Sequence, residues 1–363
     1  MLNFNLTEKK IIKYILENGK VFQNDIQIDL DLDKSNLSRF LSNCISKEIL
    51  LKDKVGKKNL FYFNKNRKYY ITFEWNRKKL ECHITNLYGE TVEKISKFSL
   101  DYDDFGSFYN SISIGINLSL SKYPVTSFIG ICFCIHGILS DNNIIRHIPN
   151  CPWKNIDLIK ICKNISSLEV FIENYTNLGA YYEKMIFYPN HTSLALVKLQ
   201  TGIGGGLVIE NRIYSGHNGG ALEIGHLTLT PTSDIEYVDI IEEEFMLKKI
   251  SEFGFKDIKE FILAYKNNDS KASTLYKLFL KNWIFMLRNL VSIINPSVLL
   301  LYHVIFNNFP HCIFEIQSAF ENSLTKPKII SFSKVPLEEY HRGINILLFN
   351  TKFDLNINKL TLI

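Results

Sequence analysis

The chain contains 363 residues, of which 46% are hydrophobic and 22% are charged, and its formal net charge is +5. This balance is ordinary for a globular protein, and the length indicates two or three domains. There is no apolar run long enough to span a bilayer and no signal-peptide pattern at the N-terminus, and the seven scattered cysteines argue against a disulfide framework. We therefore expect a cytoplasmic protein without a membrane partner.

The positive charge is concentrated at the N-terminal end. Residues 1–68 contain 14 Lys and Arg residues and 8 Asp and Glu residues, a net charge of +6, whereas the other 28 basic and 29 acidic residues give −1. Such an asymmetry favours an anionic partner for this end of the chain, with nucleic acid as the first candidate.

Three helices are expected at the N-terminal end. Thr7 can cap the first, which Asn18-Gly19 would end, and a short second helix is expected near Gln23–Asp29. Asp33 or Ser35 can cap the third. In that third helix the apolar side chains would form a buried stripe: Leu37, Phe40, Leu41 and Cys44.

The third helix would leave polar and basic side chains exposed at its start. These are Lys34, Ser35, Asn36, Ser38 and Arg39. Residues at that end of a recognition helix meet base edges and phosphates. The following stretch, Ile49–Phe63, alternates around a turn at Gly56 and resembles the wing of a winged helix-turn-helix. The lysines at its tip are Lys54, Lys57 and Lys58.

We predict a winged helix-turn-helix DNA-binding domain over residues 1–68, because the helix order, the turn and the basic hairpin agree with it. The alternative is a small helical docking domain with a solvated basic hairpin. Acidic side chains close to the proposed contact face count against DNA binding: Asp25, Asp29, Asp31 and Asp33.

A glycine-rich segment, Leu199–His226, is the most specific motif of the chain. Its first part predicts a hairpin with a glycine-rich loop, formed by Gly202, Gly204 and Gly205, whose amides can approach a phosphate or a sugar. A second glycine bend would then bring Glu223 and His226 side by side. The segment resembles the signature of the ROK family, which joins sugar kinases to sugar-responsive repressors.

The resemblance extends over nearly the whole chain. Its second specific match is Asn295–Leu301, which is similar to the family's Asn-Pro-x-x-Ile-Val-Leu strand. The resemblance implies an α/β fold in which the N-terminal winged helix-turn-helix is followed by two actin-like (RNase H-like) lobes. We expect the first lobe over residues 69–188, with a C-terminal return at about 346–363, and the second lobe over residues 189–345.

The family pattern also implies which residues would bind a sugar. In ROK proteins the last Glu and His of the glycine-rich segment hold sugar hydroxyls, and these positions are Glu223 and His226 here. Gly137 resembles the glycine of the family's sugar loop, and Asn174 stands at its Val-Glu-Asn helix start, where it could equally act only as a helix cap. The family's zinc cysteines are missing after His226, so we expect no metal site and no cofactor.

Three elements on which ROK kinases depend are degraded. The first phosphate loop is replaced by Phe73–Leu80, which contains no glycine, and Tyr175 occupies the position of the general base. A phenol is a poor base at neutral pH. The glycine run that faces the adenine in the family is replaced by Tyr302, His303 and Val304. We therefore expect no catalytic residues and no kinase activity.

These observations predict a DNA-binding transcriptional regulator of the ROK type, a repressor of carbohydrate metabolism similar to the repressors of xylose and N-acetylglucosamine use. Its lobes would close around a sugar or sugar derivative, and a homodimer or higher oligomer would bind a palindromic operator in double-stranded DNA. Two alternatives stay open. One is a ROK sugar kinase with an added N-terminal domain, and the other is a ROK regulator that responds to a protein partner instead of a sugar.

Overall fold

The computed structural model describes residues 4–140, 142–200, 202–230, 233–303 and 305–362. The chain forms two compact units: Met1–Pro189 together with Leu337–Ile363, and Asn190–Pro336. It thus returns to the first unit at Leu337, earlier than the expected position near 346. None of the helices in the described ranges is long and apolar enough to cross a membrane.

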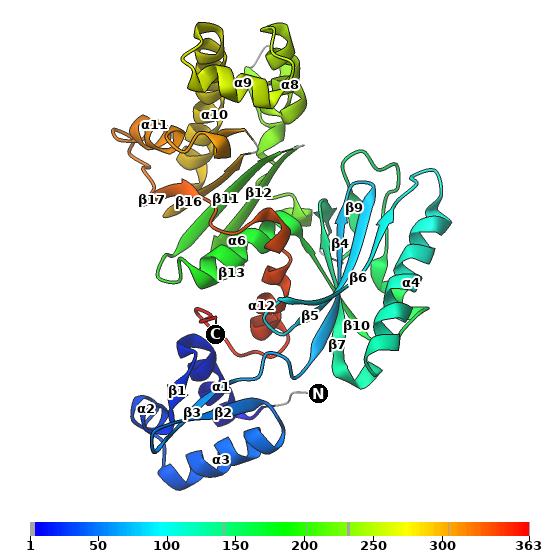
Figure 1. The fold of residues 1–363 in the computed structure, drawn as a ribbon, viewed down its shortest axis with the longest axis vertical. Helices are drawn as coiled ribbons and strands as arrows, with labels where there is room; N and C mark the ends of the chain where they lie inside the picture. Colours follow the sequence, from blue (N-terminus) through cyan, green and yellow to red (C-terminus); the bar gives the residue numbers. More distant parts are fainter. Residues whose placement is uncertain (1–3, 141, 201, 231–232, 304, 363) are drawn as a thin grey trace. The chain divides into compact units, whose positions relative to one another are not determined.

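The first unit begins with three helices and a small sheet of strand order β1-β3-β2 (Figure 1, blue). Its elements are α1 (Leu6–Asn18), β1 (Val21–Phe22), α2 (Gln23–Asp29), α3 (Lys34–Ser46), β2 (Leu50–Val55) and β3 (Lys58–Phe63). The cap of α1 is Asn5 rather than Thr7, because Asn5 Oδ1 accepts a hydrogen bond from the Glu8 amide at 2.9 Å. Asp33 caps α3, and the turn from β2 to β3 passes through Gly56 at φ +62°.

We call the part of the first unit from α1 to β3 the N-terminal segment. Its core comes mainly from α1 and α3. The buried side chains are Ile11, Ile12, Ile15 and Leu16 on α1 and Leu37, Leu41 and Cys44 on α3. Phe40 is only half-buried, so the buried stripe of α3 is narrower than expected. The three buried residues of α3 follow one i, i+4, i+7 line, and Phe40 lies at its edge.

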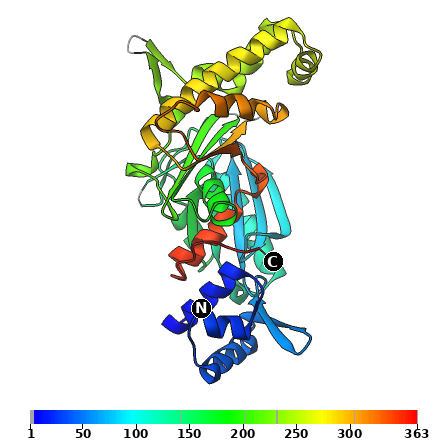
Figure 2. The same ribbon diagram turned by 90° about the vertical axis from the view of Figure 1, so that its left-hand side faces the viewer.

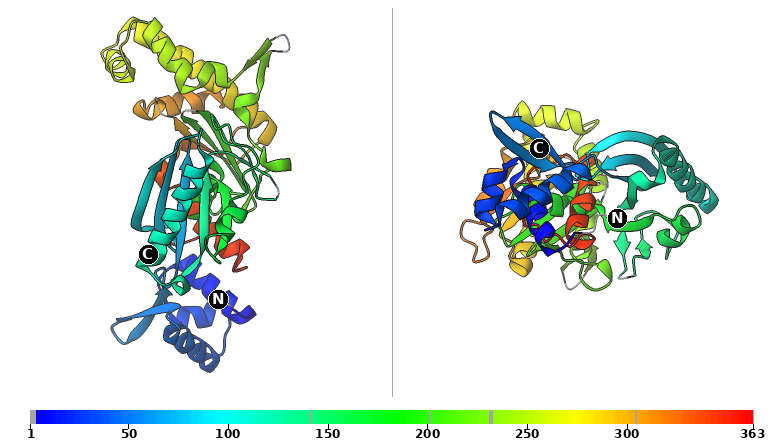
Figure 3. Two further views of the ribbon diagram at one scale, coloured as in Figure 1. Left: turned by 90° about the vertical axis from the view of Figure 1, so that its right-hand side faces the viewer. Right: turned by 90° about the horizontal axis from the view of Figure 1, so that it is seen from below.

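The second part of the first unit is a five-stranded sheet of order β10-β7-β4-β5-β6 (Figure 3, left). Its strands are β4 (Tyr69–Asn76), β5 (Lys79–Asn86), β6 (Thr91–Ser99), β7 (Phe128–Ile135) and β10 (Glu169–Asn174). Strands β4, β5 and β6 are antiparallel neighbours, whereas β7 lies parallel to both β4 and β10. Cys132 and Cys134 are buried in β7 as apolar core residues.

Four helices and a short strand pair complete this lobe. They are α4 (Phe105–Lys122), α5 (Leu158–Lys163), α6 (Tyr175–Ile186), α12 (Arg342–Thr351), β8 (Ile138–Leu139) and β9 (Ile145–His147). Helices α6 and α12 approach each other closely, because Gly179 lies against the Tyr340 ring and Gly343 lies against the backbone of Leu178. Neither glycine leaves room for a Cβ atom. Tyr340 and Gly343 therefore belong to this lobe, which explains the early return of the chain.

The second unit repeats the same strand arrangement in its own sheet, of order β13-β12-β11-β16-β17. Its strands are β11 (Ser193–Gln200), β12 (Gly202–Ile209), β13 (Arg212–Ile213), β16 (Val298–His303) and β17 (Ile329–Phe332). In both units an antiparallel three-stranded meander is extended by two strands that run parallel to its first strand. The expected α/β fold with two actin-like sheets is thus confirmed.

Helices cover the sheet of the second unit. They are α7 (Val238–Ile241), α8 (Glu243–Glu252), α9 (Ile258–Lys266), α10 (Ser270–Ile294) and α11 (Cys312–Ala319), with a hairpin of β14 (Thr228–Thr230) and β15 (Ser233–Glu236). The long helix α10 is seen from the side in Figure 2 (yellow). It buries Trp283, which stacks on Phe306 with ring centroids 5.0 Å apart, and it ends at Asn295 in the left-handed conformation ahead of Pro296.

The glycine-rich stretch forms a strand and not the expected loop. Strand β12 begins at Gly202, and Gly204 and Gly205 are paired with residues of β11. Thr201 lies outside the described residues. A Cβ atom on Gly205 would lie 2.6 Å from the carbonyl oxygen of Leu222. The glycine at this position therefore allows the following segment of the chain to pack directly on the strand.

Candidate functional site

The start of α3 and the tip of the β2–β3 hairpin carry the predicted DNA-contact residues. All of them are exposed: Lys34, Ser35, Asn36, Ser38 and Arg39 on α3, and Lys54, Lys57 and Lys58 on the hairpin. Asp33 caps α3 by accepting a hydrogen bond from the Asn36 amide at 2.9 Å. Arg39 Nη2 donates to Asn36 Oδ1 at 3.4 Å, which holds these two side chains on the same face of the helix.

The acidic residues near this surface take part in hydrogen bonds within the N-terminal segment. Asp25 accepts from the Phe22 amide at 3.4 Å, and Asp29 accepts from the Tyr14 hydroxyl at 2.5 Å. Burial and the bond to Asp29 raise the pKa of Tyr14 to about 12. Together with the cap at Asp33, these bonds give three of the four acidic residues a structural role.

A buried polar cluster lies in the first lobe around Glu74 on β4. Glu74 lies 3.1 Å from His341 Nδ1 and 3.4 Å from His83 Nε2, and it accepts a hydrogen bond from the Tyr175 hydroxyl at 3.0 Å. Burial would raise the pKa of Glu74, but the hydrogen bonds and charges of the two histidines outweigh it and hold that pKa well below its usual range. Burial likewise lowers the pKa of His341, and the Glu74 carboxylate raises it by more.

Tyr175, the first residue of α6, is fully engaged in this cluster. Its hydroxyl is 2.5 Å from the carbonyl oxygen of Leu337, and its ring stacks on His136 with centroids 4.4 Å apart. Burial, together with the charge of Glu74, raises the pKa of Tyr175 well above its ordinary value. The phenol therefore stays protonated and cannot act as a general base.

The structure brings together Gly137 and Asn174, two of the predicted sugar-binding residues. Asn174 Nδ2 donates to the Gly137 carbonyl at 2.8 Å. Asn174 Oδ1 also caps α6 by accepting from the amides of Thr176 at 2.8 Å and Asn177 at 3.2 Å. The side chain of Asn174 is thus a helix cap, whatever else it binds. The neighbouring Glu173 is buried, and burial raises the pKa of its carboxyl group.

Glu223 immediately precedes a short 3-10 turn in the second unit, Ile224–His226, and His226 is the last residue of that turn. His226 Nδ1 lies 2.8 Å from Glu236 Oε2 on β15. Burial raises the pKa of Glu223, and the nearby His226 opposes that shift. Among the residues that the structure describes, no three His, Cys, Asp or Glu side chains converge on a point where a metal ion could bind.

His303 is the last residue of β16 and stands where the ROK family has its run of glycines. Its Nδ1 accepts hydrogen bonds from the amides of Ile305 at 3.1 Å and Phe306 at 3.3 Å, and its ring lies 4.5 Å from that of Trp283. Burial lowers the pKa of His303 to about 3. Val304 lies outside the described residues.

Sequence reasoning missed the cluster around Glu74. A single carboxylate within the mainly apolar stretch Tyr70–Trp75 is a local signal of a buried polar cluster, whereas the missing glycines of this hairpin indicate only the loss of a phosphate loop. No local pattern could have connected it to His341, which is distant in the sequence and reaches it only through the return of the chain.

Residues 109–237 match the model of the ROK family. This chain carries a ROK family domain. Over 335 residues it is 26% identical to the xylose repressor of Staphylococcus xylosus, covering 87% of this chain and 87% of the repressor. It is 25% identical over 337 residues to the xylose repressor of Bacillus spizizenii, covering 86% of each chain. A glucokinase of Halalkalibacterium halodurans is 29% identical over 147 residues, which is 39% of this chain and 44% of the enzyme.

Solved structures share the ROK-type fold. A ROK family transcriptional regulator, a homolog of the E. coli MLC protein, superposes with a TM-score of 0.75 at 15% identity, covering 93% of this chain and 97% of that chain. The ROK hexokinase from Thermus thermophilus gives a TM-score of 0.64 at 18% identity, covering 79% of this chain and 99% of the enzyme. The ROK fold is therefore common to a regulator and to kinases, and the function must be argued from the sites.

Proposed function

We propose that this protein is a DNA-binding transcriptional regulator, a repressor of carbohydrate metabolism, whose ROK domain senses an effector and has no kinase activity. The observation that carries the proposal is the exposed basic surface on α3 and the β2–β3 hairpin, attached to a ROK domain. The xylose repressors named above match this chain over most of its length, which supports the same reading.

We infer a winged helix-turn-helix over residues 1–68, and the order of α1, α2, α3 and the β2–β3 hairpin supports this inference. Helix α3 would enter the major groove, where Asn36 and Arg39 can contact base edges. The hairpin tip would lie against the phosphate backbone through Lys54, Lys57 and Lys58. The match to the ROK hexokinase covers 79% of this chain, and the unmatched share is close in size to residues 1–68.

Three features of the ROK domain oppose phosphoryl transfer. Tyr175 cannot accept a proton, since its pKa is raised and its hydroxyl is bonded to Glu74. The hairpin that resembles the kinase phosphate loop, Phe73–Leu80, contains no glycine, so its backbone amides cannot approach a phosphate closely. His303 occupies the end of β16 that is glycine-rich in the kinases. Loss of a general base alone removes about 10²–10⁴-fold in rate.

The effector is proposed to be a sugar or sugar derivative, and D-xylose is the first to test because of the named relatives. The residues proposed to bind it are Gly137, Asn174, Glu223 and His226. A protein partner is the alternative effector, favoured by the internal bonds that Asn174 and Tyr175 already make. A homodimer or higher oligomer is proposed because an operator with two half-sites requires two reading heads.

Binding to a fluorescent fragment of the protein's own promoter region tests the proposal. We expect tight binding that weakens steeply between about 50 and 200 mM salt, as phosphate contacts require. Replacing Lys54, Lys57 and Lys58 with Ala should lower the slope of log K against log salt by about 3 if all three contact phosphates. Lys277→Ala, an exposed lysine on α10, is the matched control. Equal affinity for an unrelated DNA fragment, or no binding, would overturn the proposal.

The effector is tested by calorimetry with D-xylose and other sugars. Glu223→Ala should abolish the heat of sugar binding and leave DNA binding unchanged, whereas the exposed control Glu321→Ala should change neither. No heat with any sugar would favour the protein-partner version. ATP consumption with a hexose or pentose would instead support the kinase alternative.

A further inference from the structure

Helix α12 begins at the buried cluster of the first lobe. His341, immediately before it, has Nδ1 3.1 Å from Glu74 and 2.9 Å from the Glu338 carbonyl, and Nε2 3.2 Å from the Gly89 carbonyl. A carboxylate and two carbonyl oxygens can only accept hydrogen bonds, so both ring nitrogens must donate. His341 is therefore a buried imidazolium ion that joins Glu74 to the turn containing Gly89.

The first turns of α12 hold this β5–β6 turn, Asn86–Glu90, in place. Gly89 has φ +76° and lies so close to Arg342 that a Cβ atom would be 2.6 Å from its Cα atom. Asn345 Nδ2 donates to the Asn86 carbonyl at 3.0 Å and lies 3.2 Å from the Thr85 hydroxyl. The close packing of Gly89 on Arg342 and the hydrogen bonds of Asn345 thus hold the β5–β6 turn against the start of α12.

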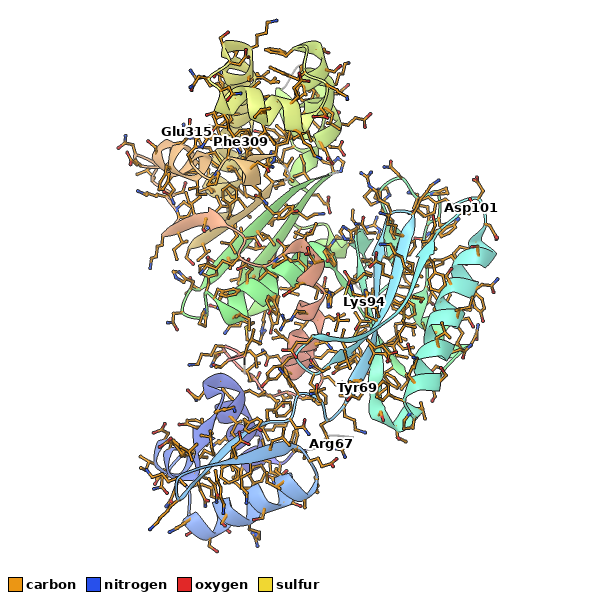
Figure 4. All side chains as sticks on the ribbon, in the orientation of Figure 1. Arg67, Tyr69, Lys94, Asp101, Phe309 and Glu315 are labelled. Carbon is orange, nitrogen blue, oxygen red and sulfur yellow. The ribbon has the colours of Figure 1, made fainter. Side chains whose placement is uncertain are left out.

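The same turn contacts the connection between β3 and β4, where the N-terminal segment joins the lobe. Lys65 Nζ lies 2.9 Å from Glu90, the Leu87 amide donates to the Lys65 carbonyl at 2.9 Å, and Asn86 Nδ2 donates to Asn66 Oδ1 at 3.0 Å. Figure 4 marks this connection by Arg67 and by Tyr69 at the start of β4. A displacement of the turn would therefore be passed to the base of the N-terminal segment.

The other end of α12 reaches the N-terminal segment directly. Phe349 packs edge-on against Phe63 at the end of β3, with ring centroids 5.7 Å apart. The chain after α12 then lies along α1 (Figure 1, near the C-terminus). There the Thr361 amide donates to the Leu16 carbonyl at 3.0 Å, and the Asn358 amide donates to the Glu17 carboxylate at 2.6 Å.

From these contacts we propose that α12 couples the Glu74 cluster to the N-terminal segment, with His341 as the positioning residue that connects the cluster to the helix. Because Gly343 packs on the Leu178 backbone without free space, α12 is expected to shift as a body and not to deform. A change around Tyr175 would then alter the position of the N-terminal segment. The biological meaning of this coupling rests on the proposed function, but the coupling itself is testable without DNA or sugar.

Hydrogen–deuterium exchange in the full chain tests the coupling. Tyr175→Phe removes the hydroxyl that bridges Glu74 and the Leu337 carbonyl. We expect it to accelerate amide exchange at residues 64–67 and 86–90 by about fivefold or more, the lower end of ordinary site-to-site coupling. The matched control is Tyr237→Phe in the second unit, which also removes a buried hydroxyl bonded to a side chain, Asn289. It should leave both stretches unchanged.

The decisive comparison is the same substitution in a His341→Gln background. Gln is neutral and cannot donate from both ends as the imidazolium does, so Tyr175→Phe should add no further acceleration there. If His341→Gln does not fold, the double variant Lys65→Met/Asn66→Ala weakens the other end of the path, because it removes both side-chain contacts and leaves the bond from the Leu87 amide to the Lys65 carbonyl. Tyr175→Phe should then accelerate exchange at 86–90 as before and at 64–67 by less.

Unchanged exchange in Tyr175→Phe, or an acceleration at 64–67 that persists undiminished in either background, would overturn the proposal. Failure of the promoter-binding experiment would leave this result unaffected. Conversely, DNA binding without exchange coupling would refute the role of α12 while leaving the proposed function in place.

Discussion

Replacing Glu74 with Gln keeps the shape of the side chain and removes its charge. The side chains of Glu74 and His341 are only 16% and 5% exposed, and the two groups are 3.1 Å apart. Removing one partner of a buried ion pair costs about 3–5 kcal/mol, because the remaining charge is left uncompensated. We expect E74Q to lower the free energy of unfolding by about 3 kcal/mol, the lower end of that range, since the Gln carbonyl can still accept a hydrogen bond.

The pH dependence of this loss has a defined sign. The pKa of Glu74 is lowered in the folded state, so its stabilisation is present above the unfolded value of about 4.3 and is lost as the pH falls through the folded value. The pKa of His341 is raised, so its stabilisation is complete below the unfolded value of about 6.5 and is lost as the pH rises through the folded value. The difference between wild type and E74Q should thus be largest between about pH 4.5 and 6.5.

Urea unfolding at about pH 5.5 and about pH 8.5 measures this difference, which should be smaller at the higher pH. His303→Gln is the control. The pKa of His303 is lowered to about 3 by burial, so the stabilisation from its neutral form is present above about pH 6.5 and is lost as the pH falls. The two variants should therefore show opposite trends. A loss below about 1 kcal/mol for E74Q at the lower pH, or one equal at both pH values, would refute the buried ion pair.

Three further predictions concern Gly205, Tyr175 and the C-terminal residues. Gly205→Ala places a Cβ atom 2.4 Å from the Cβ atom of Leu222, so it should lower the free energy of unfolding by about 1–3 kcal/mol, measured by thermal unfolding. Gly220→Ala is the control, because its Cβ atom would make only an ordinary contact and should not change the free energy of unfolding. Tyr175→Asp should not produce sugar-dependent ATP consumption in a coupled assay, because the hairpin without glycines and His303 remain. Activity above the wild-type background would contradict this. Truncation after Phe353 removes the bonds from the C-terminal residues to α1, so it should increase proteolytic cleavage between residues 64 and 68. Truncation after Thr361 keeps these bonds and should not increase the cleavage.

Local signals account for what the sequence predicted well in the N-terminal segment. The helix over Gln23–Asp29, the cap at Asp33 and the turn at Gly56 depend on neighbouring residues, and all three are present in the structure. The prediction that Thr7 caps α1 is wrong for an equally local reason: Asn5 caps the helix through reciprocal hydrogen bonds with Glu8. Whether this segment binds DNA stays a prediction that the promoter experiment decides.

The sequence by itself determined the relation to the ROK family and the two-sheet α/β fold, because the motif at Leu199–His226 and the strand at Asn295–Leu301 are contiguous and carry their own turn and strand signals. Tertiary structure alone decided how those residues are used. The sequence predicts a loop at Gly204 and Gly205, but both residues are paired with β11 in the sheet, and Gly205 leaves the space in which Leu222 packs against the strand. The Glu74 cluster likewise draws on β4, β5, α6 and the start of α12. Such contacts join residues far apart in the chain, and burial gives their charges and hydrogen bonds a strength that no local pattern of residues reveals.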